Sequence, residues 1–168
     1  MTSRAAVPTS SSAGCAPASA TAGEFIVGIV VDSDVCARPG ANTEVIYHFA
    51  ARTAVTTSVG DSRRDFEVNA TGTFNLLKGP RCAGHGPIFL YASTSTVYSG
   101  MASVPTVGLP TRHPYRVLPN GVDESYPLDL YSLYGCSKGV ADQYVRDYAR
   151  IHGLQTIVFR QSCIFGPR

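Results

Sequence analysis

Short apolar runs rich in β-branched residues are spread along the chain, and each has the length of a strand. They are residues 24–32 (EFIVGIVVD), 44–51 (EVIYHFAA), 87–94 (PIFLYAST) and 156–162 (TIVFRQS). In the first two runs apolar residues follow one another instead of alternating with polar ones, which is typical of strands buried on both faces of a parallel sheet.

Two segments between these runs carry apolar residues at helical spacing. The pattern predicts helices over 61–78, ended by Gly79-Pro80, and over 137–151, ended by Gly153. The recurring positions are Phe66, Ala70, Thr73, Leu76 and Leu77 in the first, and Val140, Ala141, Tyr144, Val145, Tyr148 and Ala149 in the second. Strands that alternate with helices predict an α/β fold with a mainly parallel sheet and right-handed crossovers.

Two other segments lack such patterns. Residues 1–23 are almost wholly Ser, Thr, Ala, Gly and Pro, with Arg4 as the single charged side chain, so we expect a low-complexity, disordered segment. Residues 99–133 are rich in proline and predict a long irregular connection, which in a compact domain is usually functional or flexible. The folded domain is therefore expected over 24–168.

Composition narrows the function classes. The net charge is +2 and the arginines are scattered, which argues against a nucleic-acid partner, and no apolar stretch is long enough to span a membrane. The 5 cysteines form no short Cys-x-x-Cys pair and the 4 histidines are dispersed, so neither a disulfide framework nor a metal site is expected. These features predict a soluble protein of a reducing compartment, the cytoplasm.

Tyr134 and Lys138 stand four residues apart at the head of the second predicted helix, so their side chains share one face. A nearby cation favours the phenolate form of tyrosine, which makes such a phenol a general acid/base closer to neutral pH. The alternative is an amphipathic helix that carries both residues by coincidence.

Other candidate residues follow three predicted strands at their carboxyl ends, where ligands bind in open α/β sheets. They are His48 to Ala51, Ser93 and Thr94, and Gln161 to Cys163. We therefore expect them to meet at one edge of the sheet.

Several motifs occur in one order along residues 24–168. They are HFAA (48–51), Asn69-x-x-Gly72-Thr73, YASTSTVY (91–98), Asp123-Glu124, YGCSK (134–138) and FRQSCIFGP (159–167). Together they resemble the extended short-chain dehydrogenase/reductase family, also called the NAD-dependent epimerase/dehydratase family, whose members act on nucleotide sugars. More narrowly, residues 55–77 and 133–168 resemble the CDP-paratose 2-epimerases, or CDP-tyvelose epimerases. The resemblance implies a partial Rossmann-like, doubly wound sheet, NAD as cofactor and a CDP-sugar as substrate.

The resemblance also implies a role for individual residues. Tyr134 is then the acid/base, Lys138 lowers its pKa and binds the nicotinamide ribose, and Thr94 hydrogen-bonds the substrate hydroxyl. Tyrosinate removes the hydroxyl proton while NAD takes the hydride, and return of the hydride to the opposite face of the ketone inverts the centre. The remaining cofactor-binding residues are Phe49, Ala50, Ala51, Asn69, Ser93, Gln161 and Ser162, and Cys163 occupies a substrate-binding position where many relatives have Asn.

Each of these residues also has a purely structural interpretation. Phe49 and the alanines fit a core, Asn69 fits a helix cap or an interior polar position, and Ser93 and Thr94 fit an ordinary strand end. The stripe over residues 140–149 fits either a homodimer interface or the core.

The sequence departs from the family at both ends. No strand, Gly-rich turn and helix opens the chain to receive the pyrophosphate, Ile29 follows Gly28 where the family usually has Asp, and the substrate-binding lobe is missing. We therefore expect a fragment with weak NAD affinity and impaired turnover. Two alternatives to an epimerase remain: an inactive remnant or interaction module, and a dehydratase or reductase. The family's dehydratases typically carry Asp-Glu after the catalytic Thr, whereas Ser95-Thr96 follow here.

Overall fold

The computed structural model of the chain describes residues 25–38, 43–79, 86–98, 100–162, 164 and 166. Their centre is a parallel sheet in the order β1-β2-β3, formed by β1 (Val45–His48), β2 (Ile88–Thr94) and β3 (Thr156–Gln161). The register places His48 beside Tyr91 and Thr94 beside Gln161, so the strands end at one edge of the sheet. The α/β, Rossmann-like fold class is confirmed; the segment 1–23 lies outside the described residues.

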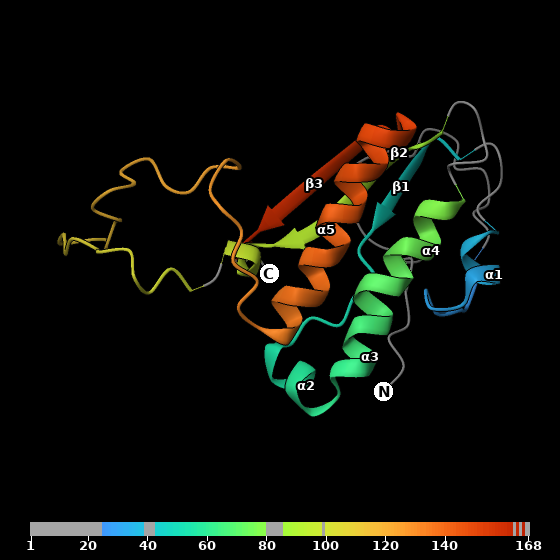
Figure 1. Ribbon diagram of the computed structural model, residues 1–168, viewed down its shortest axis with the longest axis horizontal. Coiled ribbons are helices and arrows are strands. Elements are labelled where there is room, and N and C mark those ends of the chain that lie inside the picture. The colour runs from blue at the N-terminus through green and yellow to red at the C-terminus, as the bar shows by residue number, and fades with distance from the viewer. Residues whose placement is uncertain are drawn as a thin grey trace.

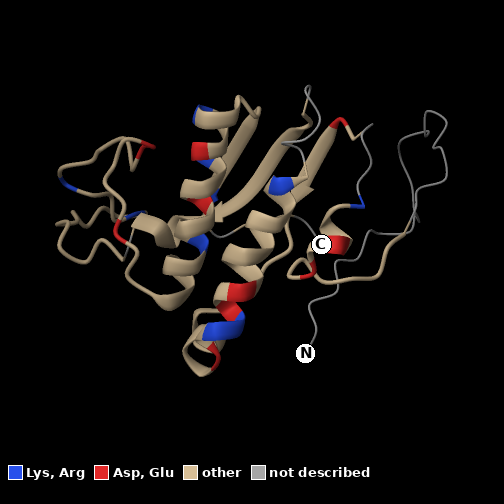
Figure 2. Cartoon of the chain, turned by 45° about the vertical axis from the view of Figure 1, so that its right-hand side comes forward, with Lys and Arg blue, Asp and Glu red and all other residues tan. Residues whose placement is uncertain are grey.

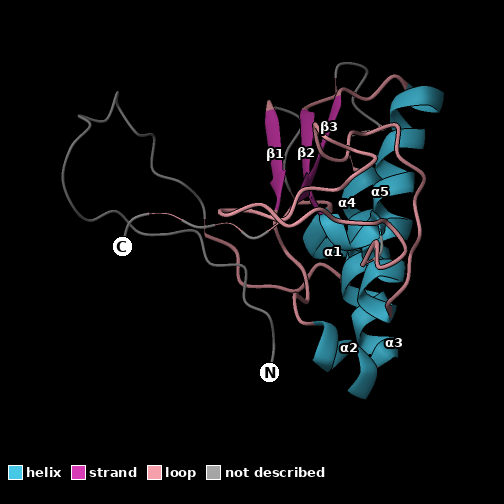
Figure 3. Ribbon diagram, turned by 90° about the vertical axis from the view of Figure 1, so that its left-hand side faces the viewer, coloured by secondary structure: helices cyan, strands magenta, loops and turns pink. Residues whose placement is uncertain are grey.

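The helices form a second layer against the sheet (Figure 3). One continuous helical segment consists of α3 (Ser62–Phe66), the π-helix η1 (Glu67–Thr71) and α4 (Gly72–Lys78). Beside it runs α5 (Leu133–His152), which Ser132 caps by accepting from the backbone N–H of Gly135 at 2.9 Å. Gly153 ends α5 with φ 68°, a left-handed conformation that favours glycine. Both predicted helices are confirmed, although α5 begins before Ser137.

Three short elements within the described ranges were not predicted. They are α1 (Ser33–Cys36), α2 (Val55–Gly60) and the 3-10 helix η3 (Ser95–Tyr98). None is long enough for a helical repeat of apolar residues to be recognised in the sequence. The predicted irregular connection is confirmed over residues 100–132, whose isolated bridge joins Thr106 and Tyr115, and it extends away from the sheet (Figure 1).

The core lies between the sheet and the helices α4 and α5. It consists of Leu77, Phe89, Tyr91, Ala141, Val145, Tyr148 and Leu154. Much of the apolar stripe of α5 is therefore core. Charged positions of both signs are interspersed along α3 and α5 (Figure 2).

The opposite face of the sheet is exposed, and the prediction of strands buried on both faces is wrong for β1. Tyr47 is 63% exposed, Ile157 on β3 is 47% exposed and Phe159 is 39% exposed. The helices of the described residues cover the other face, so no described helix lies over these side chains (Figure 3). An exposed apolar surface of this kind favours association.

The strand predicted over 24–32 is also wrong for the described residues 25–32. This segment packs on α4 instead of joining the sheet, because Asn75 Nδ2 donates to the carbonyls of Val30 at 3.2 Å and Val31 at 2.9 Å. A Cβ on Gly72 would stand 2.5 Å from Cγ2 of Val30, so glycine permits this close approach. An apolar run needs a neighbouring strand to become one, and none lies beside it among the described residues.

No helix within the described ranges is both long and apolar enough to cross a membrane. The same residues contain no cluster of three or more His, Cys, Asp or Glu side chains suited to a metal ion.

Candidate active site

A cavity of about 670 Å³ opens at the carboxyl ends of the strands. It is lined by Phe49, Ala51, Thr53 and Val55 after β1, by Ala92 to Thr96 at the end of β2, by Tyr134 and Lys138 of α5, and by Gln161, Ser162 and Ile164 after β3. The structure thus brings together most of the site residues expected from the sequence. Ala50 and Asn69 do not line the cavity, and Cys163 lies outside the described residues.

Tyr134 and Thr94 meet in this cavity from different elements. Partial burial raises the pKa of the Tyr134 phenol, a hydrogen bond with Thr94 lowers it, and the charge of Asp65 raises it. Burial is the largest of these effects, so the Tyr134 pKa is raised overall, and the expected lowering of this pKa by Lys138 stays a prediction. The Thr94 hydroxyl lies 3.0 Å from that of Thr96 and also accepts from the Thr96 backbone N–H at 3.2 Å, which orients it.

Lys138 lines the cavity, but only 3% of its surface is exposed. Its Nζ donates to the Ala92 carbonyl at 2.5 Å and lies 4.3 Å from the centre of the Tyr91 ring. Burial lowers the Lys138 pKa to about 8, and the charges of Asp142 and Asp65 oppose that shift. An ammonium group of this kind can change its charge near neutral pH.

Asn69 ties the segment after β1 to the start of α5. Its Oδ1 accepts from the Arg52 backbone N–H at 2.8 Å, and its Nδ2 donates to the Arg52 carbonyl at 3.3 Å and to Ser137 Oγ at 3.0 Å. Asn69 is 1% exposed, so it positions the cavity wall and does not itself face the cavity.

A buried charge network, which the sequence analysis missed, supports the end of β2. The Asp142 carboxylate is fully buried and accepts from Arg160 Nε and Nη2, both at 2.9 Å, and from Ser93 Oγ at 2.8 Å. The Asp142 hydrogen bonds raise the pKa of the Arg160 guanidinium. Asp142 stands one helical turn beyond Lys138, and that spacing was the only signal in the sequence.

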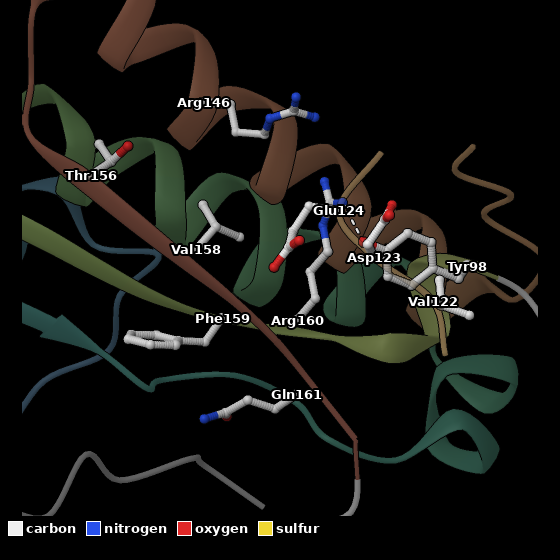
Figure 4. Close-up of a pocket in the computed structure, with 10 residues that line it drawn as sticks. All are labelled: Tyr98, Val122, Asp123, Glu124, Arg146, Thr156, Val158, Phe159, Arg160 and Gln161. Atoms are coloured by element: carbon white, nitrogen blue, oxygen red, sulfur yellow. Dashed lines mark hydrogen bonds between the residues drawn. The ribbon is translucent and has the colours of Figure 1, made fainter. Parts of the chain in front are cut away.

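Arg160 also reaches a second cavity of about 450 Å³ along the edge of β3 (Figure 4). There its Nη1 donates to the Tyr98 hydroxyl at 2.7 Å, and the ring centre lies 5.2 Å from the guanidinium carbon. The other charged lining residues are Asp123, Glu124 and Arg146. Both signs are represented, so this cavity has no charge preference that would select a ligand.

His48 lies in the core beneath the cavity and is 2% exposed. Thr73 Oγ1 donates its only proton to the Asn69 carbonyl at 2.6 Å, so His48 Nε2, 2.8 Å from the same oxygen, must be the donor to it. Burial, followed by the charge of Lys138, lowers the His48 pKa from 6.5 to about 3. The folded protein therefore holds a neutral imidazole at this position.

Acidification should destabilise the fold through His48. The His48 imidazole takes up a proton near pH 6.5 in the unfolded chain but only near pH 3 in the folded chain. The neutral imidazole therefore contributes its full stabilisation of the fold above pH 6.5, and this stabilisation is lost as the pH falls toward 3. We expect the step from pH 7 to pH 4 to remove about 3 kcal/mol of unfolding free energy through this residue. Urea unfolding of His48→Gln should show a smaller loss, whereas the exposed His152→Gln should match the parent. Equal losses in all three proteins would contradict the assignment.

A sequence profile of the "NAD dependent epimerase/dehydratase family" matches residues 3–168. The chain belongs to the NAD-dependent epimerase/dehydratase family. It is 46% identical over 122 residues to CDP-paratose 2-epimerase of Salmonella typhi, covering 73% of this chain and 36% of that protein.

Solved structures of epimerase/dehydratase proteins share the fold. A double mutant of DesIV, a dTDP-glucose 4,6-dehydratase from Streptomyces venezuelae with NAD bound, is 30% identical with a TM-score of 0.64, covering 79% of this chain and 36% of that one. UDP-glucose 4-epimerase of Thermotoga maritima is 25% identical with a TM-score of 0.66, covering 84% and 41%. The chain thus spans less than half the length of these relatives.

The epimerase/dehydratase family is NAD-dependent, and the cavity of this chain fits one part of that cofactor. Thr94, Tyr134 and Lys138 supply hydroxyl and ammonium groups suited to a ribose and a nicotinamide, with Phe49 and Ile164 as apolar walls. No strand followed by a Gly-rich turn and a helix occurs over the described residues 25–38, so this part of the chain offers no cradle for a pyrophosphate.

Proposed function

We propose that this chain carries the acid/base half of the active site of an NAD-dependent epimerase that acts on a nucleotide sugar. The observation that supports it is the meeting of Thr94, Tyr134 and Lys138 in one cavity at the carboxyl ends of β2 and β3. The similarity to CDP-paratose 2-epimerase favours a CDP-sugar as the substrate.

Each residue has a defined task in this proposal. Thr94 hydrogen-bonds the sugar hydroxyl and holds it against the Tyr134 phenol, which takes and returns the hydroxyl proton. The Lys138 ammonium stabilises the phenolate and binds the ribose hydroxyls. NAD, when bound, supplies the hydride chemistry at the sugar carbon.

A dehydratase or reductase is the nearest alternative within the family. Elimination of water needs an additional acid and base beside the reacting carbons, and the residues that follow Thr94 in the cavity wall are Ser95 and Thr96. Hydroxyl groups are poor substitutes for carboxylates in that role, which favours epimerisation. In the other alternative, an inactive interaction module, the same cavity exists without turnover.

A chimera tests the proposal. The matching segment of Salmonella typhi CDP-paratose 2-epimerase, 46% identical over 122 residues, is replaced by that of this chain. We expect a chimera that inverts the sugar centre of a CDP-sugar, measured by NMR of the product. The parent enzyme is the positive control. A chimera that folds and binds NAD but leaves the sugar unchanged would exclude the epimerase and favour the inactive module, and release of water would favour the dehydratase.

A further inference from the structure

Asp65 is a buried carboxylate on α3 without a cationic partner in the part of the chain that the structure describes. It is 1% exposed, and its Oδ2 accepts from Ser137 Oγ at 2.5 Å while Oδ1 makes no hydrogen bond there. The two preceding arginines do not pair with it, because Arg63 and Arg64 contact Glu67 at 3.0 and 3.4 Å. A buried charge is costly without compensation, so this arrangement calls for a counter-charge nearby.

The carboxylate is directed at the start of α5. Ser137, which holds it, stands directly before Lys138 and also receives the amide of Asn69. The charge of Asp65 raises the pKa of both Lys138 and Tyr134, so both side chains lie within its electrostatic reach.

Lys138 has few other groups that could stabilise its charge. Tyr91 and the Ala92 carbonyl contact it from β2, His48 on β1 is neutral, and Tyr134 and Asp142 share its helix. The charge of Asp142 favours the ammonium as well, but both of its oxygens are engaged by Arg160, whose positive charge offsets it. Among the described residues, Asp65 is therefore the carboxylate that raises the Lys138 pKa without being engaged by an arginine, and it is held by a hydrogen bond from Ser137, which stands next to Lys138 in the chain.

We propose that Asp65 is a positioning residue of the Tyr134 and Lys138 pair, whose carboxylate, anchored by Ser137, keeps the buried Lys138 side chain in its ammonium form. Its benefit to catalysis rests on the proposed function, because an ammonium beside Tyr134 favours the phenolate that the reaction needs. The electrostatic coupling itself can be measured without turnover, so its failure is distinguishable from failure of the epimerase proposal.

The chain is well suited to that measurement because Lys78 and Lys138 are its two lysines. Carbon-13 labelling at the lysine Cε gives two NMR resonances, which the Lys78→Arg variant assigns. In the parent chain Lys138 should titrate near its lowered pKa of about 8, and Lys78, exposed on α4, serves as an internal reference.

Asp65→Asn removes the charge but keeps an oxygen that can accept from Ser137. We expect the Lys138 pKa to fall by about one unit, as is typical when an opposite charge near an ionisable group is removed. In Asp65→Glu the Lys138 pKa should stay close to that of the parent chain. Asp147→Asn, which removes an exposed carboxylate of α5, should leave the Lys138 pKa unchanged. If Asp65 had a purely structural role, a folded Asp65→Asn variant would show the same Lys138 pKa as the parent chain, and this result would contradict the proposal.

Ser137→Ala provides the test if Asp65→Asn does not fold. This variant releases the carboxylate from the hydroxyl that holds it and places a good helix former in α5. We expect a smaller downward shift of the Lys138 pKa in this variant. An unchanged Lys138 pKa in the folded Ser137→Ala chain would overturn the proposal.

Discussion

Replacing Tyr134 with phenylalanine should lower the kcat of the epimerase chimera by about 10²- to 10⁴-fold, the range that general acid/base groups typically contribute. Among the described residues that line the cavity, Tyr134 supplies the one phenol, and it lies there with Thr94 and Lys138. The ring is retained in the variant, so we expect KM and NAD affinity to change little. Initial rates of sugar inversion and a titration with NAD measure the two effects separately.

The matched control is Tyr131→Phe. Tyr131 precedes α5, is 83% exposed and does not line the cavity. The variant therefore loses a hydroxyl that is close to Tyr134 in the sequence but lies outside the cavity. Its turnover should equal that of the chimera without the substitution. Turnover retained in Tyr134→Phe would remove this phenol from the mechanism and leave a lysine or a bound water as the base.

Replacing Asp142 with alanine should lower the free energy of unfolding of the chain by about 3–5 kcal/mol, as is typical when one partner of a buried ion pair is removed. The side chains of Asp142 and Arg160 are 0% and 9% exposed, so removing the carboxylate leaves a largely buried guanidinium without its partner. Ser93 loses its acceptor at the same time. Urea unfolding followed by tyrosine fluorescence and circular dichroism measures the change.

Two comparisons decide whether burial causes this loss. Asp147→Ala breaks an exposed pair with Arg150 on the same helix and should cost no more than about 1 kcal/mol. Asp142→Leu combined with Arg160→Leu removes both charges and should be less destabilised than Asp142→Ala. A loss below that of Asp147→Ala would show that the network contributes little to stability.

Many elements of the fold could be predicted from short stretches of the sequence. The helical spacing over 61–78 and 137–151 predicted the two long helical segments, and the apolar runs at 44–51, 87–94 and 156–162 predicted the three strands. The run at 24–32 has the same composition, yet its described residues lie on α4 through Asn75. Strand formation depends on a partner, and composition does not say whether one is available.

Some residues of the candidate site could likewise be predicted from the sequence, and others could not. Residues at strand ends and Tyr134 could be predicted because parallel strands place their carboxyl ends together, and most of them line one cavity. Asp65 and Asp142 were not predicted, because residue type and helical spacing alone do not establish whether a charged helix residue faces the core or faces water. Their burial depends on how α3 and α5 pack on the sheet.

The sequence by itself determined the three strands and the two long helical segments, the family and the identity of the acid/base candidates. Only the tertiary structure decided the environment of those candidates: burial raises the pKa of Tyr134, and Lys138 contacts the Ala92 carbonyl and the Tyr91 ring while the charges of Asp142 and Asp65 raise its pKa. The physical reason is that residue type and hydrophobic periodicity carry information about structure within one helix or one strand. Burial and electrostatic coupling depend on groups distant in the chain, as with Asp65 and Ser137, 72 positions apart.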